Sequence, residues 1–348
     1  MKDLKTHFDF DDILIIPKVK THIQSRYQGI SIPKTLPLFT APMDTVVNKT
    51  KYRIFLNAGI SVTLPRTIKR NDIVDLPQGV FLSMGFDDID FELKSSLRNI
   101  RNNEHILIDV ANGHMQRVFD YCREIKRLRP DIVLMVGNIA NPDTYTWYAQ
   151  GECVDYIRVG IGNGGGCLTT KQSGIGYPMA SLISATREAK VDFVKNNPNI
   201  SAPAIVADGG MKDYSDIVKS LALGADYVMI GSIFNKCLES CAKNYLYKIR
   251  INKRLARYFF KRGYPIKKYF RGMSTKSAQK AMGKTNFKTS EGVVRFRRVE
   301  YRLTGWIENF NHYLRNAMSY CDAKTLDRFI GKTNAIQITT RAYDRFNK

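Results

Sequence analysis

Eight short apolar runs, rich in β-branched residues, recur along the first two thirds of the chain. Most of them start 21 to 26 residues after the one before, which leaves room for a strand, a turn, one helix and a return. Near-continuous apolar runs of this length are typical of parallel strands that are buried on both faces. The predicted strands are Leu36–Met43, Gly59–Leu64, Val80–Gly85, His105–Ala111, Asp131–Gly137, Tyr156–Gly162, Ala204–Gly210 and Tyr227–Ser232.

Several of the connecting stretches carry apolar residues at three-to-four spacing, the pattern of a helix with one buried face. The predicted helices are His114–Leu128, Pro142–Gln150, Met179–Lys195 and Tyr214–Leu223. Eight strand–helix units favour an α/β fold of the closed (β/α)8 TIM-barrel type. The same local pattern also permits a doubly wound open sheet.

Polar or glycine residues stand at or just past the ends of the predicted strands. In a barrel these positions form the C-terminal rim, which carries the active site. Each residue alone is explained as a turn former, but seven of them on one rim indicate a functional site. They are Asp44, Gly85, Asp109, Asn138, Gly162, Asp208 and Gly231.

Two intervals break the regular spacing. The sixth and seventh strands start about 48 residues apart, and a glycine-rich segment, 162–167, opens the extra length. The eighth strand is followed by a basic segment, 235–288, and then by a helical stretch from about Gly305. Long loops in compact folds usually carry function. We expect one barrel domain over residues 1–348, with a basic insert and active-site flap at 235–292 and a C-terminal extension.

Composition excludes several classes of protein. Hydrophobic residues make up 44% and charged residues 25% of the chain, which excludes a disordered chain, a collagen-like repeat and a coiled coil. No apolar run approaches the ~18 residues of a membrane span, and the N-terminus lacks a signal-peptide core, so we expect no membrane association. The six cysteines form no CxxC pair, which favours a reducing, cytoplasmic setting.

The charge of the chain is unusual. It has 54 Lys and Arg against 32 Asp and Glu, a formal net charge of +22. No acidic residue lies between Glu239 and Glu291, while 15 Lys or Arg occur from Lys243 to Lys288. Such a block suits phosphate-bearing ligands, nucleic acid or a solvated cationic face, and composition does not choose among them.

Two kinds of glycine-rich segment carry candidate chemistry. In segment 162–167, Cys167 follows four glycines within five positions, and a thiol held at a barrel rim beside backbone donors can act as a nucleophilic thiolate. A connector with an incidental thiol explains this motif equally well. Segments 207–211 and 230–233 end the seventh and eighth strands, where glycine N–H groups and a following helix bind phosphate in many barrels. The chain has no GxxxxGKS loop, and no GxGxxG motif follows its first strand, which argues against kinase-type and Rossmann cofactor sites.

Taken together, the motifs resemble those of the IMP dehydrogenase / GMP reductase family over roughly residues 8–340. The family fold is a (β/α)8 barrel, in agreement with the strand count. The matching pieces occur in the family's order, as Phe8-Asp-Phe-Asp-Asp-Ile-Leu14, Ala41-Pro-Met-Asp-Thr-Val46, Asp109-Val-Ala-Asn-Gly113, Gly160-Ile-Gly-Asn-Gly-Gly-Gly-Cys167, Gly174-Ile-Gly-Tyr-Pro178, Asp208-Gly-Gly210, Gly272-Met-Ser274 and Ser290-Glu-Gly292.

Within this family the chain is more similar to the GMP reductases. The dehydrogenases carry an Arg-Tyr pair on a mobile flap, where it activates water, whereas segment 272–290 contains neither residue. Segment 65–79 is too short for the CBS-type regulatory domain that many dehydrogenases carry. Three alternatives stay open: an IMP dehydrogenase that converts IMP to XMP with NAD, a related purine-nucleotide reductase, and a barrel without turnover that binds nucleic acid through its basic segment.

The resemblance implies reductive deamination of GMP by NADPH, which gives IMP and ammonia. Cys167 would attack purine C2 as a thiolate and later leave from it. Thr169 and Glu291 match the family's proton relay for the departing ammonia. The carbonyls of Gly162, Gly164 and Cys167 match a potassium site, and family members are commonly homotetramers.

The remaining site residues also carry over by resemblance. Those matched to the nucleotide substrate are Met43, Asp208, Gly209, Gly210, Gly231, Ser232, Gly272, Met273, Ser274, Lys288, Ser290 and Gly292. Those matched to NADPH are Ser25, Arg26, Arg66, Asp109, Val110, Ala111, Ile161, Gly162, Asn316 and Ser319. For Arg26 and Arg66, an ordinary solvated position explains the residue equally well.

The chain departs from the family pattern in the loop before Cys167. Asn163, Gly165 and Gly166 replace the usual Pro, Ser and β-branched residue, and the missing serine removes one hydroxyl that would bond the phosphate, a contact worth about 1 kcal/mol. Lys288 stands where reductases tend to have Arg. These departures bear on substrate affinity more than on the type of reaction.

Overall fold

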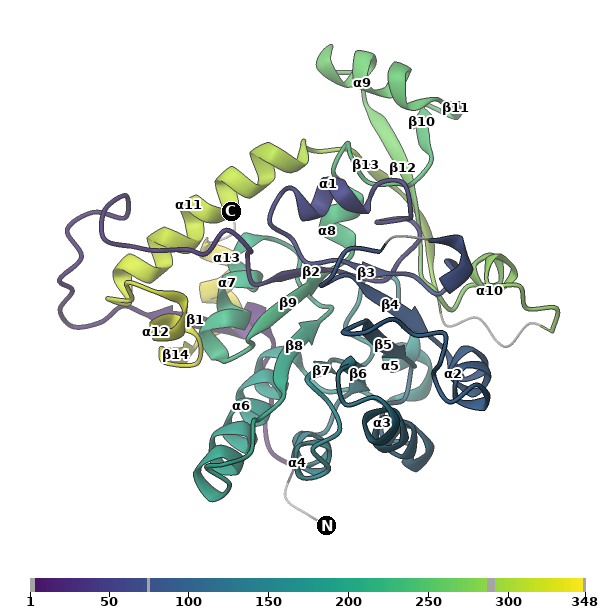
Figure 1. The fold of residues 1–348 in the computed structure, drawn as a ribbon. Helices are drawn as coiled ribbons and strands as arrows, with labels where there is room; N and C mark the ends of the chain where they lie inside the picture. Colours follow the sequence, from purple (N-terminus) through teal and green to yellow (C-terminus); the bar gives the residue numbers. More distant parts are fainter. Residues whose placement is uncertain (1–3, 74–75, 287–291, 347–348) are drawn as a thin grey trace.

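Eight parallel strands form a sheet that curls round into a barrel (Figure 1). This computed structural model describes residues 4–73, 76–286 and 292–346. The sheet order is β2-β9-β8-β7-β6-β5-β4-β3, and a parallel bridge between Phe39 and Ser61 joins its two edge strands. All eight predicted strands are confirmed, as β2 (Leu38–Thr40), β3 (Thr63–Leu64), β4 (Phe81–Met84), β5 (His105–Asp109), β6 (Val133–Ile139), β7 (Tyr156–Val159), β8 (Ala204–Asp208) and β9 (Tyr227–Ile230).

Helices cover the outside of the barrel and confirm the four predicted ones. Their apolar faces pack on the strands and on one another; for example, the rings of Phe119 and Trp147 from successive helices stack with centroids 4.3 Å apart. The outer helices are α1 (Tyr52–Leu56), α2 (Phe86–Lys94), α3 (Gln116–Leu128), α4 (Pro142–Gln150), α6 (Met179–Asn196), α7 (Tyr214–Leu223) and the single turn α8 (Ser232–Asn235). The long interval between β7 and β8 holds the glycine-rich loop, the short helix α5 (Thr169–Ser173) and α6.

The inside of the barrel has an aromatic layer at its N-terminal end. Phe39, Phe81, Tyr156 and Tyr227 meet there, and the ring centroids of Phe39 and Tyr227 are 5.2 Å apart. Three of these residues begin their strands. Charged residues occur at the opposite ends of the strands. The aromatic layer therefore closes the barrel on one side and leaves the C-terminal rim open for a site.

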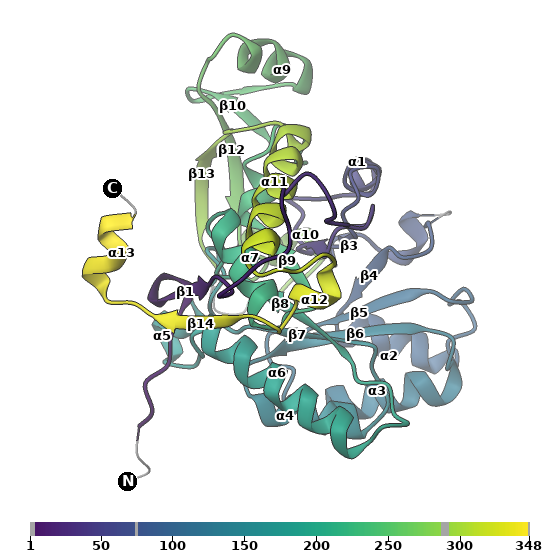
Figure 2. The same ribbon diagram turned by 90° about the vertical axis from the view of Figure 1, so that its left-hand side faces the viewer.

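The basic segment contains an antiparallel sheet that projects from the barrel. Its order is β11 (Ile249–Ile251), β10 (Asn244–Leu246), β12 (Ile266–Arg271) and β13 (Val294–Arg298), and helix α9 (Lys253–Lys261) packs on it. We call residues 243–271 and 294–298 the arm. In both views α9 and β10 extend away from the barrel (Figures 1 and 2). The flap follows β12 and contains helix α10 (Lys276–Ala281).

The C-terminal extension covers one side of the barrel. The predicted helix near Gly305 is confirmed as α11 (Leu303–Tyr320), whose Trp306 ring stacks on Tyr214 of α7 with centroids 5.2 Å apart. After α12 (Leu326–Phe329), strand β14 (Asn334–Gln337) pairs antiparallel with β1 (Ile13–Ile16), and α13 (Thr340–Phe346) follows. A short 3-10 helix, η1 (Phe10–Asp12), precedes β1, and a second, η2 (Arg70–Asp72), precedes β4. That residues 1–348 form a single domain stays a prediction. Within the described part of the chain, no helix is long and apolar enough to cross a membrane.

Candidate active site

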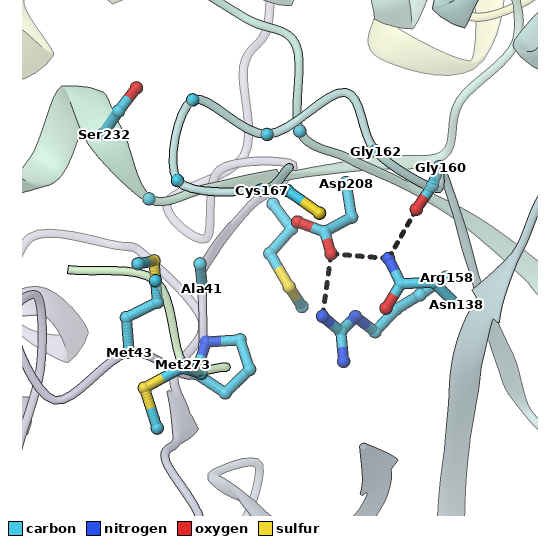
Figure 3. Close-up of a pocket in the computed structure, with 18 of the residues that line it drawn as sticks. Ala41, Met43, Asn138, Arg158, Gly160, Gly162, Cys167, Asp208, Ser232 and Met273 are labelled. Atoms are coloured by element: carbon cyan, nitrogen blue, oxygen red, sulfur yellow. Dashed lines mark hydrogen bonds and ion pairs between the residues drawn. The ribbon is translucent and has the colours of Figure 1, made fainter. Parts of the chain in front are cut away.

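A cavity of about 270 Å3 opens at the C-terminal ends of the barrel strands. In the close-up of Figure 3, Met43 and Met273 lie on one side of it, Asp208 and Arg158 lie on the other, and Cys167 projects from the loop above. The structure brings together at this cavity most of the residues predicted to form a site. Those that line it are Met43, Arg66, Asp109, Val110, Ala111, Ile161, Gly162, Gly164, Cys167, Thr169, Asp208, Gly209, Gly210, Gly231, Ser232, Gly272, Met273 and Ser274.

Four of the predicted cofactor residues lie together elsewhere. The guanidinium of Arg26 donates to Asn316 Oδ1 at 3.1 Å, and the Ser319 hydroxyl donates to the Asn316 carbonyl at 2.7 Å. Arg26 and Ser25 come from the long loop that follows β1, and the other two residues lie on α11. None of the four lines the cavity.

The predicted residues of the flap are placed only in part. Lys288, Ser290 and Glu291 lie outside the described residues. Gly292 forms an antiparallel bridge with Cys167, and the next residue, Val293, donates its N–H to the Gly166 carbonyl at 3.1 Å. The C-terminal end of the flap is therefore hydrogen-bonded directly to the loop that carries the Cys167 thiol.

The loop before Cys167 presents the thiol to the cavity. The Cys167 N–H donates to the Gly164 carbonyl at 2.9 Å, and the Cys167 Sγ lies 3.2 Å from Thr169 Oγ1. Gly162 has φ +82°, and a Cβ there would lie 1.7 Å from Thr170 Oγ1, so only glycine fits this turn. Cys167 is half-buried, which leaves the thiol accessible from the cavity.

The other thiols are placed for packing. Cys122, Cys153, Cys237 and Cys321 are buried, and the half-buried Cys241 donates its S–H to the Asp44 carbonyl at 2.9 Å. Burial raises the pKa of Cys237 to about 11 and that of Cys241 to about 12. Burial therefore keeps the thiols of Cys237 and Cys241 protonated and unreactive near neutral pH.

A buried network of charges forms the floor of the cavity. Arg158, on β7, is 5% exposed, and its guanidinium contacts Asp109 Oδ1 and Asp208 Oδ2, each at 2.7 Å. Asn138 donates to Asp208 Oδ2 at 2.8 Å, and Arg66 contacts Asp109 from the cavity side at 3.1 Å. The network thus links a residue predicted for the cofactor, Asp109, to one predicted for the substrate, Asp208. Figure 3 shows the contacts of Asp208 with Arg158 and Asn138.

Sequence reasoning did not identify Arg158. The signal was present, since this residue is the one charged side chain in the predicted strand Tyr156–Gly162, and a buried charge requires a partner. Burial opposes ionisation of Asp109, but Arg66 and Arg158 more than offset it, so the pKa of Asp109 lies below its ordinary value. Asp109 is therefore held as a carboxylate that accepts hydrogen bonds.

The glycines that end β8 and β9 lie against the Cys167 loop. A Cβ at Gly209 would lie 2.9 Å from the Gly164 N–H nitrogen, so a side chain at this position would push the two loops apart. Gly210, Gly231 and Ser232 also line this part of the cavity. The helix after β9, α8, is a single turn, and the Asp213 side chain accepts from the Asp216 N–H at the start of α7.

The flap begins on the arm and crosses the cavity. Phe270, Gly272, Met273 and Ser274 line it, and the Gly272 N–H donates to the Val293 carbonyl at 3.0 Å. Arg271 forms an ion pair with Asp44, at the end of the β2 segment. The flap is therefore anchored at its base to both the barrel rim and the Cys167 loop.

The groups that line the cavity indicate which kinds of ligand it could bind. Among the residues that the structure describes, no cluster of three or more His, Cys, Asp or Glu side chains could hold a transition metal. The backbone carbonyls of the Cys167 loop are hard oxygen donors, the type that suits alkali and alkaline-earth cations. The apolar walls with a few convergent polar groups fit an organic ligand.

The fold and the site define a class of protein: a (β/α)8-barrel enzyme with an accessible cysteine on a glycine-rich loop at its C-terminal rim. Residues 90–345 match the family model described as "IMP dehydrogenase / GMP reductase domain". The chain therefore belongs to the IMP dehydrogenase / GMP reductase family, and it is an oxidoreductase. The family resemblance and the barrel fold inferred from the sequence are both confirmed.

Curated relatives extend this similarity over most of the chain. A protein named GMP reductase from Streptococcus pyogenes serotype M4 (strain MGAS10750) is 28% identical over 339 residues, 92% of each chain. A GMP reductase from Streptococcus agalactiae serotype V (strain ATCC BAA-611 / 2603 V/R) is 28% identical over 337 residues, again 92% of each. Another, from Streptococcus pyogenes serotype M5 (strain Manfredo), is 31% identical over 255 residues, 68% of this chain and 72% of that one.

Proposed function

We propose that the protein is a GMP reductase, which catalyses GMP + NADPH + 2 H+ → IMP + NADP+ + NH4+. One observation carries the proposal: the Cys167 thiol faces a cavity lined by nearly all the described residues that match the family's nucleotide site, with the Thr169 hydroxyl 3.2 Å away. The names of the relatives support the same reaction. As expected for a cysteine enzyme with free thiols, we place it in the cytoplasm, where thiols stay reduced.

In the proposed mechanism, Cys167 is both nucleophile and leaving group. Its thiolate attacks purine C2, an S–C2 bond forms, and the C2–N2 bond breaks as ammonia leaves. Thr169 and Glu291 pass the proton that the departing ammonia needs. Bound NADPH supplies the hydride that reaches C2, after which the S–C2 bond breaks and the thiolate is restored.

The remaining residues hold the two ligands. Met43 and Met273 would pack against the purine, and Asp208 would accept hydrogen bonds from the ribose hydroxyls. Gly209, Gly210, Gly231 and Ser232 would donate to the phosphate. Gly272 and Ser274 would lie around the purine with the two methionines, and Lys288, Ser290 and Gly292 would complete the nucleotide site.

The residues at the cavity also fit the nicotinamide end of NADPH. The Asp109 carboxylate, the segment 109–111 and the apolar Ile161 offer one polar and several apolar contacts, and Arg66 adds a cation. Ser25, Arg26, Asn316 and Ser319 would act on NADPH only where the cofactor extends beyond this cavity or is bound by a neighbouring subunit of the proposed homotetramer. Hard carbonyls of Gly162, Gly164 and Cys167 would hold a potassium ion.

The test is a pair of assays that follow reduced-nicotinamide absorbance. With GMP, the purified protein should consume NADPH and release one ammonia per IMP formed. With IMP and NAD, it should form no XMP at a steady rate, because segment 272–290 lacks the Arg-Tyr pair that would activate water. Steady XMP formation would favour the IMP dehydrogenase alternative, and reduction of a different purine nucleotide would favour a related reductase.

A second candidate function rests on the arm. No acidic residue occurs from 240 to 290, and the arm carries exposed aromatic side chains between its cations, among them Tyr247 at 66% and Phe296 at 55% exposure. Cations with interleaved aromatic rings suit single-stranded nucleic acid, whose phosphates and bases they contact respectively. We propose that the arm binds such a polyanion in addition to the activity of the barrel.

A further inference from the structure

Two side chains from the arm lie against the Cys167 loop: Phe270, which lines the cavity, and Arg297, which lies next to Gly165. Gly165 and Gly166 line the cavity but contribute no side chain to it. A Cβ at Gly166 would lie 3.1 Å from the ring of Phe270, and a Cβ at Gly165 would lie 3.1 Å from Nη2 of Arg297. The space that side chains of the loop would otherwise fill is therefore occupied by a phenyl ring and a guanidinium group.

Arg297 lies on β13 and is held by packing, not by charge. Its guanidinium lies over the Phe270 ring, 4.4 Å from the ring centroid, and its Nε is buried without a hydrogen-bond partner. No ion pair or hydrogen bond joins Arg297 to any residue that the structure describes. Arg66, Arg158 and Arg271, in contrast, are each paired with a carboxylate.

The surroundings of Arg297 make an unpaired cation unfavourable. Burial, and then the neighbouring Arg295 charge, lower the pKa of the Arg297 guanidinium. Lys268 stands opposite Arg297 on the neighbouring strand β12. The negative charge of Glu300 favours the Arg297 cation, but the Glu300 carboxylate forms an ion pair with Lys236 at 3.0 Å. A partly buried guanidinium without a partner costs free energy that a bound anion would recover.

We propose that Arg297 binds the phosphate of the purine nucleotide, and that the glycines at 165 and 166 make room for it. The inference rests on the proposed function only in taking a purine monophosphate as the ligand. A guanidinium binds phosphate through two parallel N–H···O bonds. Arg297 lies beside Gly165, and the adjacent Gly164 lies beside the strand-end glycine Gly209. Because all three glycines line the cavity, a phosphate bound at the strand-end glycines would lie on the side of the loop next to Arg297.

The experiment compares ligands with and without phosphate. Binding of GMP, IMP, ribose 5-phosphate and guanosine is measured by calorimetry without cofactor, for the wild type, Arg297→Met and Arg298→Met. Methionine keeps the packing on Phe270, and Arg298 is an exposed cation one residue away that serves as the matched control. Arg297→Met should weaken binding of all three phosphate-bearing ligands about 10- to 100-fold, as expected for loss of a charge-assisted pair, while guanosine binding and the control variant stay within about twofold.

A second variant tests whether a side chain at position 165 of the loop and the Arg297 side chain of the arm compete for the same space. Gly165 has no positive φ, so serine is compatible with its backbone. Gly165→Ser alone should weaken GMP binding because its Cβ would crowd Arg297, whereas Gly165→Ser combined with Arg297→Met should bind GMP more tightly than Arg297→Met alone. Unchanged phosphate binding in Arg297→Met, or an equal loss for guanosine, would overturn the inference. If the chain turns over IMP instead of GMP, the GMP reductase proposal fails, yet the dependence of IMP binding on Arg297 still decides this one.

Discussion

Cys167 differs from the other five cysteines in its position. It is half-buried, faces the cavity and lies 3.2 Å from a hydroxyl. We expect Cys167→Ser to lose at least about 10³-fold in kcat while binding GMP nearly as well as the wild type, because a serine oxygen is a poorer nucleophile and a far poorer leaving group. The measurement is steady-state NADPH consumption together with GMP binding by calorimetry.

The matched control is Cys321→Ser, at the end of α11 and outside the cavity. It should retain turnover. Mass spectrometry of enzyme quenched during turnover should find a purine adduct on Cys167 and on no other cysteine. Wild-type rates in Cys167→Ser would disprove the covalent mechanism.

Arg158 holds two carboxylates that belong to different ligand subsites. Arg158→Met would leave Asp109 and Asp208 buried without their shared cation, which should cost about 3–5 kcal/mol of unfolding free energy. Arg158→Lys keeps the charge but not the fork that contacts both carboxylates at 2.7 Å. We therefore expect the lysine variant to fold with a smaller loss and to show raised KM values for both GMP and NADPH.

Urea unfolding and the two KM values measure these effects. A purely structural role would lower stability and leave both KM values unchanged in the folded lysine variant. A rise in only one KM would show that Arg158 positions one carboxylate and not both.

At the scale of single residues, the sequence predicted those site residues whose surroundings are formed by adjacent positions in the chain. Cys167 and the strand-end glycines occur in short motifs, so their neighbours in the chain already indicate their surroundings. Arg158 and Arg297 were not predicted as site residues, because their environments depend on partners that only the closed barrel and the folded arm bring near: Asp109 and Asp208 for the first, Phe270 and Gly165 for the second.

At the scale of single elements, helix α7 begins with a buried carboxyl group. Asp216 is 4% exposed, and its Oδ2 accepts the Lys212 N–H at 2.8 Å. Burial, together with the charges of Asp213 and Asp11, raises the pKa of Asp216 to about 6, although the Lys212 hydrogen bond and Lys219 oppose the shift. Since this pKa exceeds the ordinary value of 3.8, the folded state binds the proton more tightly than the unfolded state does.

The expected consequence is a loss of stability as the pH rises from about 4 to about 6. The neutral carboxyl group is tolerated below this window, and the buried carboxylate above it destabilises the fold by on the order of 2–3 kcal/mol. Asp216→Asn keeps an acceptor for the Lys212 N–H and carries no charge. It should exceed the wild type in unfolding free energy by about 1–3 kcal/mol at pH 7 and match it at pH 4, as measured by urea unfolding at each pH.

Asp192→Asn is the control, because it removes an exposed carboxylate from the neighbouring helix α6 and not from the surroundings of Asp216. It should show no comparable difference between pH 4 and pH 7. A constant offset between Asp216→Asn and the wild type at every pH would contradict the raised pKa.

Elements with continuous apolar runs were predictable, and elements with mixed faces were not. All eight barrel strands are buried on both sides, so their residues are nearly all apolar. In contrast, β13 alternates arginine with exposed apolar residues, as in Val294 and Phe296, and β12 places the charged Lys268 on its buried face, between Ile266 and Phe270. In these strands the polarity of a residue does not match its burial, because a lysine is buried in β12 and apolar side chains are exposed in β13. The sequence therefore indicated only a basic insert where the structure has a four-stranded sheet.

At the scale of the whole molecule, the net charge of +22 is distributed unevenly. The barrel side of the site neutralises its own cations, since Arg66 and Arg158 are paired with aspartates. Arg271, the arm residue next to the rim, is likewise paired with Asp44. The arm has no acidic residue and extends away from the barrel (Figure 2). A polyanion can therefore reach the arm at a distance from the ion pairs around the cavity.

The arm should bind single-stranded DNA and heparin with strong salt dependence. Helix α9 presents the exposed cations Lys253, Arg254, Arg257 and Lys261, and each phosphate that such a cation neutralises releases counterions. Replacing these four residues by glutamine should lower the salt at which the protein elutes from heparin and reduce the slope of log K against log salt by up to about 3, at ~0.7 per contact for a single strand.

The control replaces an equal number of exposed cations on the barrel helices and their ends, Lys94, Arg98, Arg123 and Lys195, so that net charge changes equally. Binding that weakens equally in both variants would reduce the effect to net charge, and no retention of the wild type on heparin or DNA at low salt would disprove polyanion binding altogether. Because α9 lies outside the cavity, GMP turnover should be the same in the wild type and both variants, which makes the DNA titration a test of the arm alone.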